Sequence, residues 1–129
     1  MSQAQAIQAT ADQLGDLVER YFAMWNETNP ERRREIIART WTESAHYLDP
    51  MLQGDGRDGI DAMVKAVQER FPGHKFRLKG GIDAHHDRLR FAWDLASETG
   101  VPVASGLDFG VVADGVRLAT ITGFLDAAP

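Results

Sequence analysis

The feature that most limits the fold of this chain is a change in the spacing of its apolar residues near residue 73. Before that point they recur every three or four positions, which is the period of a helix with one buried face. The clearest helical run is Leu14, Leu17, Val18, Tyr21, Phe22 and Trp25. After that point apolar and polar residues alternate, as in a half-buried strand. Helices followed by consecutive strands predict an α+β fold: three N-terminal helices packed on a curved, cone-shaped antiparallel sheet.

Capping residues predict where the first two helices begin. Thr10 and Gln13 have the spacing of a capping box, in which each side chain bonds to the backbone N–H of the other residue. Asn29 stands directly before a proline, which is typical of an N-cap and the first helical position. The apolar face of this second helix ends at Trp41. We expect the three arginines at 32–34 to lie on its opposite face, in solvent.

The segment between the second and third helices contains both a strand and a loop signal. Residues 46–48 predict a short strand, which ends before Pro50 because proline lacks a backbone N–H. Residues 53–59 include three glycines and predict a loop. The third helix is expected to begin with Asp58 as its N-cap and to run as far as Phe71, before a Pro-Gly pair.

The second half of the chain predicts four long strands in a meander. Residues 97–100 are typical of a hairpin connection, and Asp114-Gly115 is a strong two-residue turn signal. Short connections of this kind join neighbouring antiparallel strands. The expected strands cover residues 75–82, 88–95, 101–113 and 116–125.

Length and charge exclude several classes of protein. The 129 residues predict a single domain over 1–129, with 1–11 as a flexible or additional N-terminal segment. The formal charge of −5 argues against a nucleic-acid partner, which would require a basic surface. The absence of cysteine excludes disulfides, thiol catalysis and cysteine-ligated zinc. With neither a signal-peptide pattern nor an apolar membrane span, we expect a cytoplasmic protein without a membrane partner.

Glycines within the expected strands predict a strongly bent sheet. Gly80, Gly81, Gly106, Gly110 and Gly123 interrupt apolar runs, and glycine in a strand usually marks a bend or a close approach. A bent sheet closed by helices is either filled by side chains or left open for a small apolar ligand. The residues expected to line such a pocket are Trp25, Trp41, Tyr47, Met51, Phe71, Phe76, Phe91, Trp93 and Ile121.

Two aspartates are the strongest candidates for chemistry. Asp49 ends the short strand, and Asp108 lies in the middle of an apolar strand, where a carboxylate is rarely buried without a reason. The alternatives for Asp108 are exposure on the outer sheet face or pairing with an arginine such as Arg88 or Arg90. We expect no cofactor and no metal. His85 and its neighbour His86 would point to opposite faces of a regular strand.

Two sequence segments resemble a known family. They are Tyr21-Phe22-Ala23-Met24-Trp25-Asn26 at the end of the first helix and Tyr47-Leu48-Asp49-Pro50 before a glycine-rich loop. Together with the order of elements, they resemble the nuclear transport factor 2-like superfamily and, within it, the SnoaL-like, polyketide-cyclase-like group. The resemblance extends from about Asp12 to Leu125. It implies a cone-shaped fold with a small-molecule pocket and a homodimer through the outer sheet face, where Phe109 and Val111 are expected.

The ketosteroid isomerases of this superfamily offer a more detailed comparison. Their pattern of a tyrosine on the first helix, an Asp-Pro after a short strand and an aspartate in a late strand is similar to Tyr21, Asp49 and Asp108. The resemblance implies that Asp49 is the base and that Tyr21 and a neutral Asp108 donate hydrogen bonds to an enolate oxygen. The function expected on this basis is a cofactor-independent isomerase or cyclase acting on an apolar carbonyl compound.

Three other functions compete with proton transfer. The chain is alternatively a non-catalytic module that binds a small ligand, or a dimeric scaffold with a filled cone. Water activation of the epoxide-hydrolase type would need an arginine beside Asp108, and Arg77, Arg88 and Arg90 are the candidates. Such an arginine would keep Asp108 ionised and would exclude its role as a neutral donor.

Overall fold

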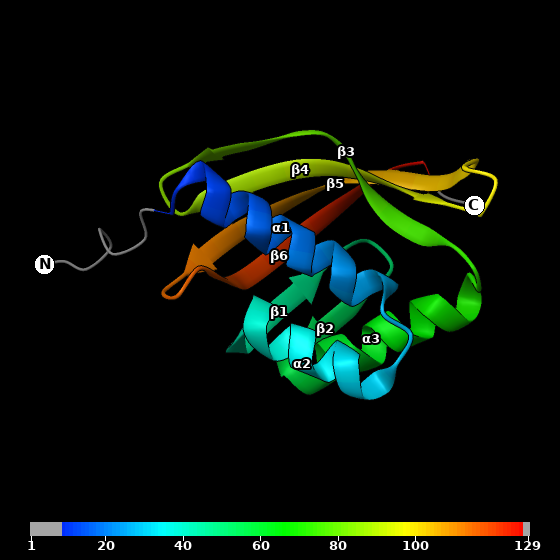
Figure 1. Cartoon of the computed structure of the whole chain (residues 1–129), viewed down its shortest axis with the longest axis horizontal. Helices are drawn as coiled ribbons and strands as arrows, with labels where there is room; N and C mark the ends of the chain where they lie inside the picture. Colours follow the sequence, from blue (N-terminus) through cyan, green and yellow to red (C-terminus); the bar gives the residue numbers. More distant parts are fainter. Residues whose placement is uncertain (1–8, 128–129) are drawn as a thin grey trace, which may run out of the picture.

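The structure, a computed structural model, describes residues 9–127 and consists of three helices and one six-stranded sheet (Figure 1). The sheet order is β2-β1-β6-β5-β4-β3, and only the β1–β6 pair is parallel. The expected α+β cone and the four-strand meander are confirmed. The elements are α1 (Ala11–Asn26), α2 (Pro30–Thr40), β1 (Trp41–Leu48), β2 (Gln53–Asp55), α3 (Gly56–Arg70), β3 (Lys75–His85), β4 (Arg88–Ala96), β5 (Pro102–Ala113) and β6 (Arg117–Ala127). The predicted N-terminal segment lies mostly outside the described residues.

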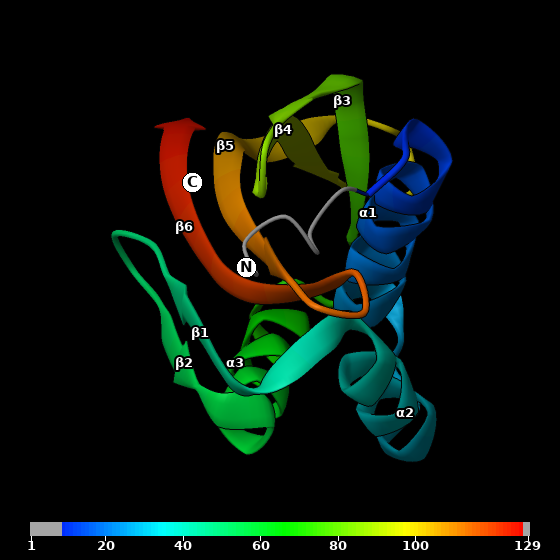
Figure 2. The same cartoon turned by 90° about the vertical axis from the view of Figure 1, so that its left-hand side faces the viewer.

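The sheet bends around the helices. Figure 2 shows β3 to β6 curving over α1, while α3 lies against β1 and β2. Gly80 has φ +78° at an irregularity between Lys79 and Ile82, where the register of β3 against β4 shifts. Only glycine adopts that backbone conformation without strain, so this position allows β3 to bend. Curvature leaves the inner face of the sheet directed at α1 and α3.

The starts of α1 and α2 are as predicted, whereas α3 begins earlier. Thr10 and Gln13 form the capping box, and the Asn29 side chain accepts a bond from the backbone N–H of Arg32. The predicted loop 53–59 is wrong, because residues 53–55 pair with β1 as β2 and residues 56–59 form the first turn of α3. The N-cap of α3 is therefore Asp55, while Asp58 lies in the first turn.

The first strand is also longer than predicted. Trp41 is not the last helical residue but the first residue of β1, with an extended backbone and a fully buried side chain. Tyr47 pairs with Ile121 of β6, and Leu48 pairs with Thr122. β1 thereby carries Asp49 to the part of the sheet where the last two strands meet.

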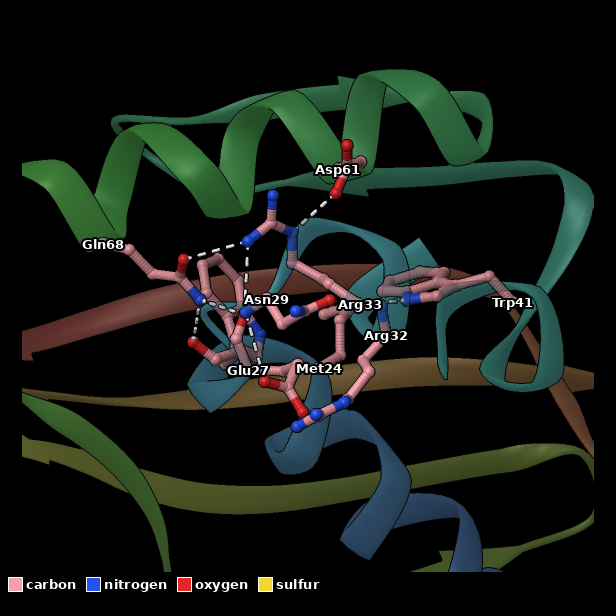
Figure 3. A network of polar contacts seen from close by, with 9 residues as sticks. Met24, Glu27, Asn29, Arg32, Arg33, Trp41, Asp61 and Gln68 are labelled. Carbon is pink, nitrogen blue, oxygen red and sulfur yellow. Dashed lines mark hydrogen bonds and ion pairs between the residues drawn. The ribbon is translucent and has the colours of Figure 1, made fainter. Parts of the chain in front are cut away.

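The expectation that all three arginines of α2 face solvent is wrong for Arg33. Its side chain is 2% exposed, and its Nε donates to Asp61 at 2.6 Å. Its Nη1 donates to the carbonyl of Glu27 at 3.2 Å and to the side chain of Gln68 at 3.0 Å (Figure 3). Gln68 in turn donates to the carbonyls of Trp25 and Glu27. Arg33 thus joins the end of α1 to α3, and its neighbours on α2 remain exposed.

The outer sheet face carries exposed aromatic residues. Phe109 of β5 is 39% exposed, and Phe124 of β6 is 56% exposed. Phe124 lies opposite Leu107 on this outer face, away from the core. No helix among residues 9–127 is long and apolar enough to cross a membrane.

Candidate functional site

A cavity of about 120 Å³ opens between the helices and the inner sheet face. That volume exceeds what one or a few waters need and suits a small organic molecule. Its inner end is formed by buried side chains, whereas the exposed lining residues, Met51 and Arg70, mark its opening. The predicted lining residues that the structure places on this cavity are Trp25, Tyr47, Met51, Phe71, Phe76 and Trp93.

Three predicted lining residues belong to the core instead. Trp41 is 0% exposed and donates its indole N–H to the sulfur of Met24. Phe91 packs edge-on against Tyr21, with ring centroids 5.4 Å apart. Ile121 is fully buried beside Gly110. These three side chains are buried in the core and do not line the cavity.

Asp108 lies at the buried end of the cavity and is 2% exposed. The Tyr21 hydroxyl donates to its Oδ2 at 2.6 Å, and the indole N–H of Trp93 donates to its Oδ1 at 3.1 Å. Trp93 can approach so closely because Gly106 has no side chain. A Cβ there would lie 2.6 Å from the indole ring. One acceptor site on each carboxylate oxygen is left for a ligand or a proton.

The surroundings of Asp108 favour its neutral form. Burial raises its pKa to about 6; the bonds from Tyr21 and Trp93 lower it, while the charge of Asp49 raises it. The Asp108 carboxyl is therefore half protonated near pH 6 and mostly ionised at pH 7. Burial, followed by the charge of Asp108, raises the pKa of Tyr21 and of Tyr47 well above the ordinary value, so both remain hydrogen-bond donors.

Asp49 lies directly after β1, nearer the opening. Its Oδ1 accepts the backbone N–H groups of Met51 and Leu52, both at 2.8 Å, in the manner of an Asx turn. Its Oδ2 accepts the Tyr47 hydroxyl at 2.6 Å. The adjacent Pro50 restricts the Asp49 backbone to an extended conformation. The chain then turns, so that the N–H groups of Met51 and Leu52 reach the Asp49 carboxylate. Three donors hold this side chain in one orientation.

Gly123 of β6 brings the two carboxylates together. A Cβ built on Gly123 would lie 2.9 Å from Oδ1 of Asp108, 3.1 Å from Cβ of Asp49 and 3.4 Å from the Tyr47 hydroxyl. All three side chains therefore occupy the space that any other residue would fill here. The expected juxtaposition of Tyr21, Asp49 and Asp108 around one cavity is observed, although their chemical roles stay predictions.

Solved structures give the comparison that decides the family. A proposed isomerase of the SnoaL-like family from Agrobacterium tumefaciens is 40% identical, with a TM-score of 0.85 over 90% of this chain and 99% of that chain. This chain belongs to the SnoaL-like family. A proposed SnoaL-like polyketide cyclase from Jannaschia (15% identity, TM-score 0.69, 90% and 87% covered) supports the fold alone. So does an NTF2-like protein of unknown function from Exiguobacterium (16% identity, TM-score 0.68, 85% and 98% covered). No family model matches the chain, and no curated protein matches its sequence.

Several features of this SnoaL-like cavity were not predicted from the sequence. The hydrogen bonds of Tyr47 to Asp49 and of Trp93 to Asp108 depend on rotamers that no sequence pattern indicates. The unpredicted lining residues are Phe22, Leu52, Val67, Arg70, Leu95, Ala104 and Leu125. Most of them continue apolar runs that the sequence does show. Arg70 is the exception, because a charged helix end normally indicates only a solvated surface.

The three candidate arginines of the SnoaL-like chain do not reach Asp108. Arg77 pairs with Asp94 at 2.5 Å, Arg90 pairs with Asp83 at 3.0 Å, and Arg88 pairs with its neighbour Asp87. None of them lines the cavity. The geometry therefore gives no support to an Asp–Arg–Asp arrangement for epoxide hydrolysis at Asp108. Within residues 9–127, no group of three or more metal-ligating side chains is found.

Proposed function

We propose that this SnoaL-like protein is a cofactor-independent isomerase or cyclase that moves a proton on an apolar carbonyl compound. The observation that carries the proposal is the meeting of Asp49 with the Tyr21–Asp108 pair around Gly123, in one apolar cavity. A base and a hydrogen-bond donor on one bound carbonyl compound are what enolisation requires. The Agrobacterium neighbour, described as a proposed isomerase, favours the same chemistry.

Asp49 acts as the base in this proposal. Its carboxylate is the proton acceptor and is bonded by the backbone N–H groups of Met51 and Leu52 and by the Tyr47 hydroxyl. They also fix the direction of the carboxylate. Oδ2 accepts the hydrogen bond from the Tyr47 hydroxyl and keeps a second acceptor site for a carbon acid in the cavity.

The Tyr21–Asp108 pair acts as the donor. With Asp108 ionised, the Tyr21 proton is held between the two groups and is not available to a ligand. Uptake of one proton gives the pair a second O–H, one bridging and one free to bond the carbonyl oxygen. A ligand that accepts this bond binds the protonated pair better, so binding is coupled to proton uptake above pH 6.

Exchange of the α-protons of 1-tetralone for solvent deuterium, followed by proton NMR, tests the base. We expect Asp49→Asn to slow enzyme-dependent exchange by about 100-fold or more, because the amide cannot accept the carbon-bound proton. The asparagine carbonyl can still accept the two backbone bonds that hold the loop. Ligand binding, measured by quenching of tryptophan fluorescence, should be retained.

The control is Asp58→Asn, which removes the same charge from the exposed first turn of α3 and should leave exchange unchanged. A non-catalytic binding module remains the second candidate, because all three donors to Asp49 also serve the fold of its loop. Binding of 1-tetralone without any enzyme-dependent exchange would reject the isomerase proposal and favour that module. If the protein neither binds 1-tetralone nor exchanges its α-protons, the result would count against both the isomerase and the binding module.

A further inference from the structure

The opening of the cavity carries one cation. Arg70 is the last residue of α3 and, with Met51, one of the two exposed lining residues. Its guanidinium carbon lies 5.4 Å from the ring centroid of Phe71, which also lines the cavity. A cation over an aromatic face is held by the ring quadrupole. The side chain is therefore kept at the opening and is not directed away along the helix axis.

Charge is distributed unevenly along the cavity. The other charged lining residues, Asp49 and Asp108, are both acidic and are less exposed than Arg70. The ion pairs found among residues 9–127 do not include Arg70. An anionic group on a ligand is thus repelled from the inner end and attracted to the opening, which fixes the orientation of the ligand.

The space between the two ends is aromatic. The rings of Trp25 and Phe76 have centroids 4.8 Å apart, and those of Phe76 and Trp93 are 5.3 Å apart. All three side chains line the cavity. Flat, apolar ring systems pack well against such a wall. The lining therefore favours an aromatic body between the carbonyl group and the opening.

We infer that the substrate is an aromatic carbonyl compound with a carboxylate at the end opposite its reacting carbonyl, and that Arg70 binds this carboxylate. The inference rests on the proposed function, since it places the carbonyl at the Tyr21–Asp108 pair. Arg70 is a binding residue here and takes no part in proton transfer. A guanidinium suits the task because its planar N–H groups match a carboxylate.

Binding of two matched probes tests the inference. They are 6-carboxy-1-tetralone and its neutral 6-carboxamide, titrated against tryptophan fluorescence at constant ionic strength. We expect the wild type to bind the carboxylate about fivefold more tightly than the amide, the upper range for an ion pair near solvent. In Arg70→Met, which keeps the apolar stem, the preference should disappear. In Lys65→Met, which removes one positive charge from the exposed face of the same helix, it should be unchanged.

Raised salt should weaken the preference in the wild type alone. Equal affinity for the two probes, a preference that survives in Arg70→Met, or failure of both probes to bind would overturn the assignment. Failure of the proposed function is a separate result. In that case the carboxylate preference depends on Arg70, but neither tetralone exchanges its α-protons faster with enzyme than without.

Discussion

The protonation state of Asp108 depends directly on the side chains that surround it in the structure. Burial favours its neutral form, but the donors Tyr21 and Trp93 favour its anion, and the result is a pKa of about 6. A carboxyl with that pKa changes charge in the range where cells and assays operate. The state of the Tyr21–Asp108 pair, acceptor or donor, therefore depends on modest changes in pH or on what the cavity contains.

The titration of Asp108 has a consequence for stability. The folded chain binds more protons than the unfolded chain between about pH 4 and pH 6, because the pKa of this carboxyl is raised on folding. We expect the free energy of unfolding of the wild type, relative to Asp108→Asn, to fall by a few kcal/mol as pH rises through that window. Above it the difference should be constant. Urea unfolding at a series of pH values measures the difference.

Carbon-13 NMR of the Asp108 carboxyl provides the direct check, with an expected midpoint near pH 6. A midpoint near pH 4 would contradict the raised pKa and would remove the neutral donor from the proposed mechanism.

For single residues, the sequence predicted their positions in the fold better than their hydrogen-bond partners. A helical stripe, a residue before proline and alternation in a strand singled out Tyr21, Asp49 and Asp108, and the resemblance to ketosteroid isomerases implied that they meet at one cavity. The bonds of Tyr47 and Trp93 could not be foreseen, since they follow from side-chain rotamers set by packing. Gly123 was predicted to mark a bend, whereas its close approach to both aspartates is visible only in the tertiary structure.

Among the elements, α2 is the helix whose packing was hardest to predict from the sequence. It is short and strongly charged, and its attachment to α1 and α3 depends on the buried Arg33 as well as on apolar contacts. The sequence could not reveal this, because three consecutive arginines look alike until the partner helix is in place. Similarly, β2 was missed because its three residues contain too short a run to show alternation.

Replacement of Arg33 should destabilise the packing of the three helices. We expect Arg33→Met to lower the free energy of unfolding by about 3 kcal/mol, because it leaves the Asp61 carboxylate and the side-chain oxygen of Gln68 without their donor. Arg34→Met, on the exposed side of the same helix, should change stability by no more than about 0.5 kcal/mol. Urea unfolding of both variants measures the contrast. A loss in Arg33→Met no larger than in Arg34→Met would mean that the network adds nothing to stability.

The whole molecule has one face that its helices do not cover. Phe109 and Phe124 are exposed on adjacent strands of the outer sheet face, and large aromatic side chains at a sheet surface favour association. A second copy related by a two-fold axis would cover this face with the same residues on each side. We therefore expect a homodimer, with β5 and β6 at its centre.

Sedimentation velocity over a range of concentrations tests this expectation. Phe124→Glu should raise the dissociation constant by about 30-fold or more, because it places a charge where an apolar contact is buried. Val101→Glu adds the same charge at an exposed apolar residue before β5 and should have little effect. A wild-type chain that sediments as a monomer at all concentrations would contradict the expected dimer.

The parallel pairing of β1 with β6 also governs the order in which the molecule can be assembled. Tyr47 meets Ile121 only across more than half of the chain, so this contact carries a high entropic cost and forms late in folding. Until β6 is in place, Asp49 lacks its neighbour Gly123. The proposed catalytic groups lie on segments that are far apart in the sequence and meet only when this pairing forms. A partly folded molecule therefore lacks both the cavity and the proposed activity. During refolding, activity should return only when the native structure is complete.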